Sequence, residues 1–560
     1  MVLLSRCANL IQNFCQKVER IHGKYLEIAA CIIYAVAHML MAIVHEPWYD
    51  EAVAWQIARC ASIQDILFEI PHYEGHPPLW HLILVPFAKL GAPYELSLSI
   101  ISLIFSGTAI SLIIWKAPFP RIIRLLLPFT YFFFYQYGVI ARPYCVMMLV
   151  FVLLALNWHR RNTHPGIYTV LLMLLCLTSA YGIVIAGGLA IAWIIEIWNF
   201  QNIREFARNL MKNKKLLFLL MLLLFALLLI MEIMPREDTF ATNHMSRSMG
   251  SNFVNYLLYM LLALPAEVSM TSIYVEYQLL KNVELPFSIL MPTCLIGCIF
   301  WGVVICWGKT KQTLWTLIIP YLFFALFSAI VYIYPHHIGI ALFVFMFWFW
   351  INCKVKTNLP RPSSLLASPK TTITNVLTIL GSMAVVISLC WNVSSCVQDV
   401  LSGYAIGRNE AAFIKKHGLD NYRIMVGWEV FYDEEEENII GMDINHCICA
   451  DNVAPYFEHN IFFNFNNGED SLNFSNHKSA SEEYTASCLA QWKEQPPDVL
   501  FMSPRLDLVY DNTKLILDNY KLVYLESYNR VWKGFPNYSR ARIYVKSKLA
   551  EILGLEEIYN

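Results

Sequence analysis

Uninterrupted apolar runs constrain this chain more than any other feature of its sequence. Residues 26–44 and 216–234 approach the ~20 apolar residues that cross a bilayer as a helix. Apolar residues make up 57% of the chain and charged residues only 15%, whereas a soluble protein has ~25% charged residues. We therefore predict a mainly α-helical, polytopic membrane protein. Its net charge of -1 gives no indication of a nucleic-acid partner.

Basic residues at the ends of the apolar runs predict the orientation of the chain, because Lys and Arg of short loops stay in the cytoplasm. Residues 1–25 have no signal-peptide cleavage pattern, so we expect a cytoplasmic segment. With the other basic clusters on the same side, a transmembrane domain of residues 26–391 contains about eleven spans. The N-terminus is then inside and the C-terminus outside. The expected spans are 26–44, 95–115, 122–140, 143–158, 166–182, 183–199, 216–234, 285–307, 313–333, 338–353 and 371–391.

Two outer segments of this topology, 45–94 and 235–284, each contain a short apolar stretch. Residues 78–90 and 253–264 are too short for a comfortable span. They predict helices that lie at the outer membrane interface.

Residues 392–560 are expected to form an extracytoplasmic α/β domain. Their composition is mixed and charged, and helical patterns alternate with strand patterns. This alternation is typical of a small α/β domain with some parallel strand pairing. The expected strands are 423–426, 498–502, 522–525 and 542–545, and the expected helices are 410–417 and 512–519. This region has no Gly-rich loop that would indicate nucleotide binding.

The first outer segment carries two adjacent carboxylates, Asp50 and Glu51, shortly after Pro47. The proline, the acidic pair and the apolar positions that follow at helical spacing predict the start of a helix. Two interpretations of the pair remain open. The carboxylates could complement the helix dipole, or they could act in catalysis at the membrane surface, with one of them as a general base.

Two basic side chains at outer turns are candidates for binding a phosphate. His76 stands just before Pro77 and Pro78, where a helix N-terminus favours an anion. Arg142, two residues before Tyr144, has the planar guanidinium that binds phosphate in bidentate fashion. The alternatives are loop punctuation for His76 and an interfacial anchor for Arg142.

His336 and His337 follow Pro335 at another outer turn. They are either ordinary turn residues or part of the same site. The sequence around them lacks the spacing of a metalloprotease helix, and no second acidic ligand set is evident, so we predict no bound metal and no cofactor. All of these polar groups fall on one outer surface in the predicted topology, which favours a single polar site over separate explanations.

The order of the motifs resembles a known superfamily. HEPWYDEAVAWQIAR (45–59), YEGHPPLWHLIL (73–84) and YGVIARPY (137–144), with weaker support from YPHHIGIALFVF (334–345), are similar to the C-type (GT-C) membrane glycosyltransferases. The nearest branch is glycosyltransferase family 39, which includes protein O-mannosyltransferases and aminoarabinose transferases of lipid A. The resemblance covers the membrane half of the chain and does not extend to residues 392–560.

This resemblance implies transfer of a sugar from a polyprenyl-phosphate donor to a glycan, lipid or protein acceptor on the outer side, with inversion at the sugar. Asp50 would be the catalytic base, with Glu51 as the second member of the pair. The candidates for binding the donor phosphate or substrate are His76, Arg142, Tyr144, His336, His337 and Arg59. Many relatives have a basic residue soon after the acidic pair, whereas the first one here is Arg59.

Two functions from other classes remain as alternatives. A transporter or flippase of lipid-linked sugars is one, although such proteins usually carry polar or broken helices near the bilayer midplane. A non-catalytic surface scaffold is the other. The expected location is a bacterial plasma membrane, with a site that faces outward and contributes to the biosynthesis of envelope glycans.

Overall fold

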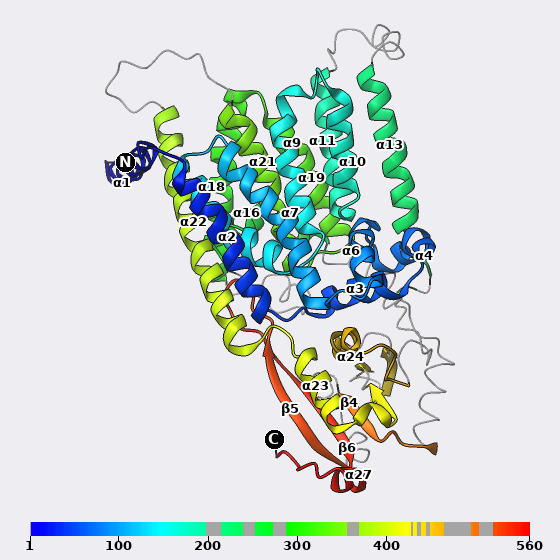
Figure 1. Ribbon diagram of the computed structural model, residues 1–560. Helices are drawn as coiled ribbons and strands as arrows, with labels where there is room; N and C mark the ends of the chain where they lie inside the picture. The colour runs from blue at the N-terminus through cyan, green and yellow to red at the C-terminus, as the bar shows by residue number, and fades with distance from the viewer. Residues whose placement is uncertain are drawn as a thin grey trace.

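The computed structural model describes most of the chain. The described residues are 2–197, 214–237, 239, 253–272, 287–354, 369–426, 429–433, 438–443, 448–463, 494–502 and 519–559. They form a bundle of long helices with a smaller α/β domain at one end (Figure 1). The prediction of a mainly helical membrane protein with a small C-terminal sheet agrees with this architecture.

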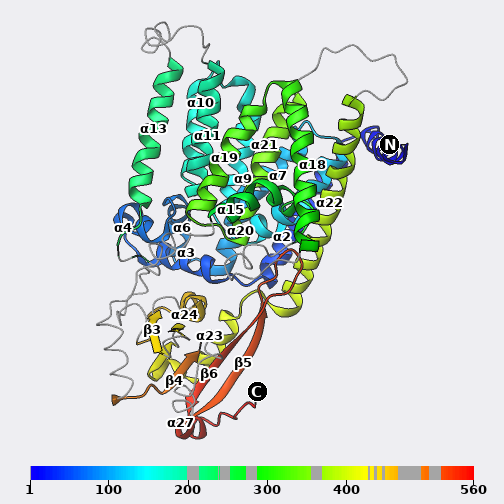
Figure 2. The ribbon, with the colours of Figure 1, turned by 180° about the vertical axis from the view of Figure 1, so that it is seen from behind.

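Seven helical segments of the described chain are long and apolar enough to cross a membrane. They are Tyr25–Val44 (α2), Tyr94–Lys116 (α7), Ala180–Ile197 (α11), Lys215–Ile233 (in α13, Lys214–Ile233), Leu290–Lys311 (in α18, Phe287–Lys311), Pro335–Cys353 (α20, Pro335–Ile338, and α21, Ile340–Lys354) and Asn375–His417 (α22, Pro369–Ser402, and α23, Gly407–His417). In both views α13 and α22 stand at opposite edges of the bundle (Figure 2).

Three predicted spans coincide with shorter helices: α9 (Tyr144–Asn157), α10 (Pro165–Cys176) and α19 (Leu314–Ile330). The predicted span 122–140 is not one continuous helix. It consists of α8 (Arg121–Leu126), a 3-10 turn (η1, Leu127–Phe129) and a π-helix (η2, Phe132–Val139). Pro128 lies in the turn, and a proline cannot donate the backbone hydrogen bond that would continue the helix.

The remaining helices of the described membrane half are short or lie at its ends. They are α1 (Val2–Glu19), α3 (Tyr49–Cys60), α4 (Ile63–Phe68), α5 (Ile70–Glu74), α6 (Leu79–Lys89), η3 (Trp158–Arg160), α15 (Phe253–Leu258), η4 (Tyr259–Ala263) and α16 (Leu264–Glu267). The short helices predicted over 78–90 and 253–264 thus correspond to α6 and to α15 with η4.

The C-terminal domain contains a four-stranded sheet with the strand order β1-β4-β6-β5. β1 (Ile424–Val426) and β4 (Val499–Met502) are parallel, and β5 (Tyr520–Asn529) and β6 (Tyr538–Lys546) form an antiparallel hairpin. Each strand overlaps a predicted one, and α23 covers the helix predicted over 410–417. The helix predicted over 512–519 lies outside the described residues except at its last residue.

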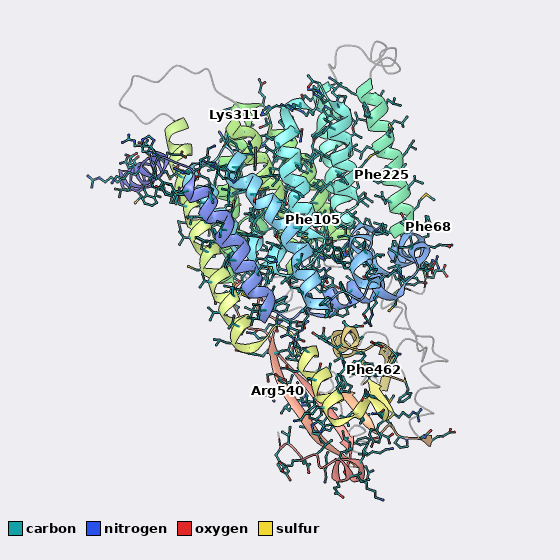
Figure 3. The ribbon with its side chains drawn as sticks, viewed as in Figure 1. Phe68, Phe105, Phe225, Lys311, Phe462 and Arg540 are labelled. Carbon is teal, nitrogen blue, oxygen red and sulfur yellow. The ribbon has the colours of Figure 1, made fainter. Side chains whose placement is uncertain are left out.

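A separate hairpin, β2 (Glu429–Asp433) and β3 (Asn438–Asp443), was absent from the sequence prediction. The other elements of the domain are η5 (Leu419–Asn421), α24 (Ile448–Val453), η6 (Ala454–Tyr456) and α27 (Ser547–Ile552). Residue 392, the predicted domain boundary, lies within α22, which continues to Ser402. Phe462 and Arg540 belong to the domain, whereas Lys311 lies at the far end of the bundle (Figure 3).

Helix α3 lies between the bundle and the C-terminal domain and is buried on both sides. Ala52 and Trp55 pack in the core of the bundle. Val53 and Ile57, on another face, pack in the core that contains the sheet of the C-terminal domain. This double burial fixes the helix that begins with the acidic pair.

The β5–β6 hairpin ends inside the bundle. Trp532 and Phe535 close a two-residue turn, and Lys533 and Gly534 have φ angles of +47° and +79°, as a type I′ turn requires. Val531 and Trp532 belong to the core of the bundle. The hairpin therefore ties the C-terminal domain to the membrane half.

Candidate functional site

The two carboxylates of the acidic pair have different environments, although they are adjacent in sequence. Glu51 is only 1% exposed. Its Oε2 accepts a hydrogen bond from the Trp48 amide at 3.2 Å, and its Oε1 accepts one from the Ala141 amide at 2.6 Å. The first bond closes the start of α3, and the second joins α3 to the turn between η2 and α9, 90 residues away. Glu51 therefore links two turns of the chain.

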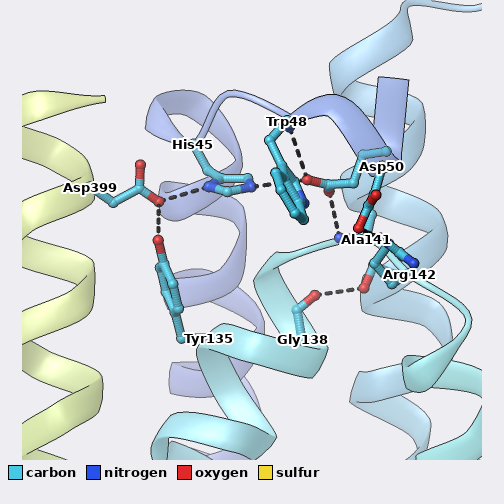
Figure 4. A network of polar contacts seen from close by, with 10 residues as sticks. His45, Trp48, Asp50, Tyr135, Gly138, Ala141, Arg142 and Asp399 are labelled. Atoms are coloured by element: carbon cyan, nitrogen blue, oxygen red, sulfur yellow. Dashed lines mark hydrogen bonds and ion pairs between the residues drawn. The ribbon is translucent and has the colours of Figure 1, made fainter. Parts of the chain in front are cut away.

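Asp50 is the more accessible carboxylate, with 18% of its side chain exposed. It forms an ion pair with Arg142, whose side chain is 11% exposed. Arg142 directly follows Ala141, so the bond from Ala141 to Glu51 holds the same turn that presents the guanidinium (Figure 4). The guanidinium also lies 5.8 Å from the centre of the Tyr144 ring, within the range of a cation–π contact.

The histidines at the start of α20 lie beside this turn. The rings of His337 and Tyr144 are 6.0 Å apart, and those of His336 and Trp48 are 6.2 Å apart. His337 Nδ1 accepts a hydrogen bond from the Tyr334 amide at 3.1 Å and lies 3.0 Å from the Tyr181 hydroxyl. His337 therefore stabilises its own turn, whereas His336 has no such local bond among the described contacts of its ring.

His76 precedes α6, as the sequence predicted, and lies close enough to His336 and His337 to interact with them electrostatically. The preceding Gly75 has a φ angle of +62°, which allows the chain to leave α5 and turn toward α6. The structure thus brings Asp50, Arg142 and the three histidines to one end of the bundle.

Arg59 lies apart from this set. Its guanidinium donates to the carbonyl oxygens of Ala454, Pro455 and Phe457 at 3.4, 3.4 and 2.9 Å. These carbonyls belong to η6 and the residue that follows it. Arg59 therefore attaches α3 to the C-terminal domain.

A buried row of polar groups connects Glu51, on α3, through His45 to Asp399, on α22. His45 Nε2 lies 3.5 Å from Glu51 Oε2, and His45 Nδ1 lies 2.7 Å from Asp399 Oδ2 on α22. The Tyr135 hydroxyl donates to the same Asp399 oxygen at 2.9 Å. His45 therefore lies between the two carboxylates, with one ring nitrogen toward each. Figure 4 shows the side of the ring that faces Asp399.

The environment raises the pKa of His45 and of Glu74, which both lie near the site. Burial by itself would lower the pKa of His45, but Asp399 and Glu51 outweigh it and raise the value to about 10. His45 is therefore an imidazolium at neutral pH. Burial raises the pKa of Glu74, on α5, to about 7. Glu74 interacts electrostatically with Tyr49, the residue before Asp50.

Sequence reasoning missed His45, Asp399, Tyr135 and Glu74. The first two had a detectable signal, because an ionisable side chain within or beside an apolar run is costly unless it is paired. Nothing in the sequence shows that His45 and Asp399 meet, since 354 residues separate them.

Among the described residues, no group of three or more His, Cys, Asp or Glu side chains is arranged to hold a metal ion. No protein-family model, curated protein or solved structure matches the chain. The geometry and the motifs are therefore the basis for a functional proposal.

Proposed function

We propose that this protein is a membrane glycosyltransferase that moves a sugar from a polyprenyl-phosphate donor to a hydroxyl group of an acceptor. The observation that carries the proposal is the meeting of Asp50 and Arg142, a carboxylate and a guanidinium from two turns far apart in sequence. The resemblance of the surrounding motifs to C-type glycosyltransferases of family 39 supports the same assignment.

The two groups match the two demands of this reaction. Asp50 accepts the proton of the acceptor hydroxyl as its oxygen forms a bond to C1 of the sugar. The bond between C1 and the phosphate oxygen breaks at the same time, and its electron pair leaves with the phosphate. Arg142 stabilises the charge that develops on that leaving group. The products are the glycosylated acceptor, with inversion at C1, and the polyprenyl phosphate.

The ion pair between Asp50 and Arg142 adds an order of events to this proposal. In the structure the guanidinium is paired with the carboxylate that must act as the base. A donor phosphate competes with Asp50 for the guanidinium, because the planar guanidinium of an arginine can bind either a phosphate or a carboxylate. Binding of the donor would therefore release Asp50 to accept a proton, so the donor binds before the acceptor reacts.

The position of the site suits a donor with a lipid tail. Asp50 lies in the first turn of α3. This helix lies next to the short apolar helix α6, at the end of the helical bundle that faces the C-terminal domain (Figure 1). A polyprenyl chain can remain among the apolar helices while its phosphate reaches this end. The C-terminal domain, which packs against α3, would then shape the space for the acceptor.

The test uses the full-length protein in proteoliposomes with undecaprenyl-phosphate mannose, glucose and aminoarabinose as donors and a detergent extract of host membranes as the acceptor. We expect release of undecaprenyl phosphate from one donor, and no release with Asp50→Asn. Glu458→Gln, at an exposed carboxylate of the C-terminal domain, is the control that keeps activity. Movement of an intact donor between leaflets, without cleavage, would identify a flippase instead.

A further inference from the structure

Three buried ionisable side chains form a row that ends beside the Asp50–Arg142 pair. Asp399, His45 and Glu51 are 0%, 4% and 1% exposed, and each is in contact with the next. They come from α22, the end of α2 and the start of α3. None of them contacts Arg142 directly in the described structure, so the row has no evident role as a base or as a phosphate ligand.

The charge of His45 decides what this row can do. A neutral imidazole has a single N–H group, whereas an imidazolium donates from both ring nitrogens. His45 has a carboxylate on each side and can attract both only in the charged form. Its raised pKa, about 10, is consistent with that form.

The other groups around His45 are two tyrosine rings, a second histidine and the carboxylate of Glu46, which is electrostatically coupled to His45. The rings of Tyr135 and Tyr404 lie 6.2 and 5.1 Å from its ring. His38, on α2, is electrostatically coupled to it but makes no hydrogen bond with it. Glu46, the next residue, directs its Oε1 to the Arg408 amide at 2.7 Å. Asp399 and Glu51 are therefore the groups that fix the charge of His45.

Both ends of the row are held in place. The Tyr135 hydroxyl donates a hydrogen bond to the Asp399 carboxylate and holds it in place. At the other end, Glu51 binds the Ala141 amide, and the next residue is Arg142. Asp50 in turn precedes Glu51 in the chain. A movement of Glu51 would therefore change the position of both members of the proposed catalytic pair.

We propose that Asp399 and His45 are positioning residues, which hold Glu51 so that the Asp50 carboxylate and the Arg142 guanidinium keep their relative placement. This inference rests on the proposed function for its activity readout. If the row had a purely structural role, its three charged groups would contribute to the stability of the fold but not to the rate of sugar transfer.

The substitution Asp399→Asn separates these roles. The asparagine oxygen still accepts hydrogen bonds from His45 and Tyr135, but it no longer favours the imidazolium. We expect transfer at pH 8 to fall on the order of 10- to 100-fold, the loss caused by a misplacement of about 1 Å. Activity should recover at pH values below the ordinary histidine pKa of ~6.5, whereas the wild type should show no such recovery.

Glu27→Gln is the matched control. Glu27 forms a buried ion pair with Arg121 at 2.6 Å, away from the site. This variant should lose stability but keep the wild-type pH profile. If Asp399→Asn retained wild-type transfer and its pH profile, or lost activity equally at every pH, the positioning role would be overturned.

A second readout does not depend on turnover of any donor. Hydrogen exchange at the Ala141 amide should be faster in Asp399→Asn than in the wild type at pH 8, and unchanged in Glu27→Gln. Unchanged exchange in Asp399→Asn would overturn the positioning role. Faster exchange without turnover of any donor by the wild type would count against the proposed function alone.

Discussion

Lys533 Nζ lies 2.8 Å from Glu267 Oε1, although the two residues are 266 positions apart, and both side chains are fully buried. Lys533 also donates to the Thr271 carbonyl oxygen at 3.0 Å and lies 4.7 Å from the centre of the Trp391 ring. The charge pair of Lys533 and Glu267 therefore anchors the tip of the β5–β6 hairpin in the membrane half, and the Thr271 carbonyl oxygen accepts a further hydrogen bond from Lys533.

The first prediction concerns this anchor. Lys533→Ala should lower the free energy of unfolding by about 3–5 kcal/mol, because it leaves the Glu267 carboxylate buried without its partner. The measurement is reversible denaturation in mixed micelles. The double variant Lys533→Met/Glu267→Gln should recover most of the loss. A single variant as stable as the wild type would contradict the burial of this pair.

The second prediction tests the close approach of α11 and α19. A Cβ atom at Gly188 would lie 2.4 Å from the Pro320 Cα atom, whereas one at Gly187 would have no neighbour within 4 Å. Gly188→Ala should therefore cost about 1–3 kcal/mol through overpacking. Gly187→Ala, the adjacent control, should be close to neutral. Equal effects of the two variants in thermal unfolding would show that these helices pack differently.

The third prediction separates the two carboxylates of the acidic pair. Asp50→Asn should reduce sugar transfer by about 10²–10⁴-fold, because the general base is lost, with normal membrane insertion. Its loss of thermal stability should be smaller than that of Lys533→Ala, because the asparagine oxygen can still accept a hydrogen bond from Arg142. Glu51→Gln should lower the thermal stability of the protein in addition to its rate of sugar transfer, because the Glu51 carboxylate accepts hydrogen bonds from the Trp48 and Ala141 amides. Comparison of initial rates with melting temperatures checks both. Wild-type transfer by Asp50→Asn would remove Asp50 from the mechanism.

The fourth prediction concerns Arg142. Arg142→Lys keeps the positive charge but loses the planar, bidentate geometry. We expect the donor KM to rise about tenfold, the equivalent of one hydrogen bond of ~1.4 kcal/mol, with a smaller change in kcat. Steady-state kinetics over a range of donor concentrations give both constants. An unchanged KM would exclude Arg142 as a phosphate ligand.

The fifth prediction follows from Glu46. Burial raises its pKa to about 7 despite the neighbouring Arg408, so the folded state favours the protonated carboxyl. Its contribution to stability is therefore greatest below the ordinary pKa of about 4.5 and is lost as the pH rises through about 7.

Glu46→Gln should consequently be more stable than the wild type at pH 8, by on the order of 1–3 kcal/mol, and the difference should vanish near pH 4.5. Thermal unfolding across this pH range measures the effect, with the exposed Glu458→Gln as the control. A lower stability of Glu46→Gln at pH 8 would show that the charged form is favoured in the folded protein.

Much of the fold could be predicted from the sequence, because it follows from local patterns. Long apolar runs identify helices such as α2 and α13, and short apolar runs that follow a polar residue identify β1 and β4 as buried strands. The segment predicted as a span over 122–140 is divided into α8, η1 and η2, because Pro128 interrupts the helix. The β2–β3 hairpin was missed because the acidic run 433–437 stands between its two short apolar stretches, and acidic residues are depleted in strands.

The sequence by itself determined that a helix begins at the acidic pair and that Asp50, His76, Arg142 and the two adjacent histidines could share one surface. Only the tertiary structure decided that Asp50 pairs with Arg142 and that Glu51 links two turns of the chain. Glu51 binds the local Trp48 amide at the start of α3. The rest of the difference between Asp50 and Glu51 arises from groups that are 90 or more residues away from Glu51, namely the Ala141 amide, Arg142 and Asp399 beyond His45. Hydrogen bonds and charge pairs act over a few ångströms, so they depend on which chain segments the packed helices bring together.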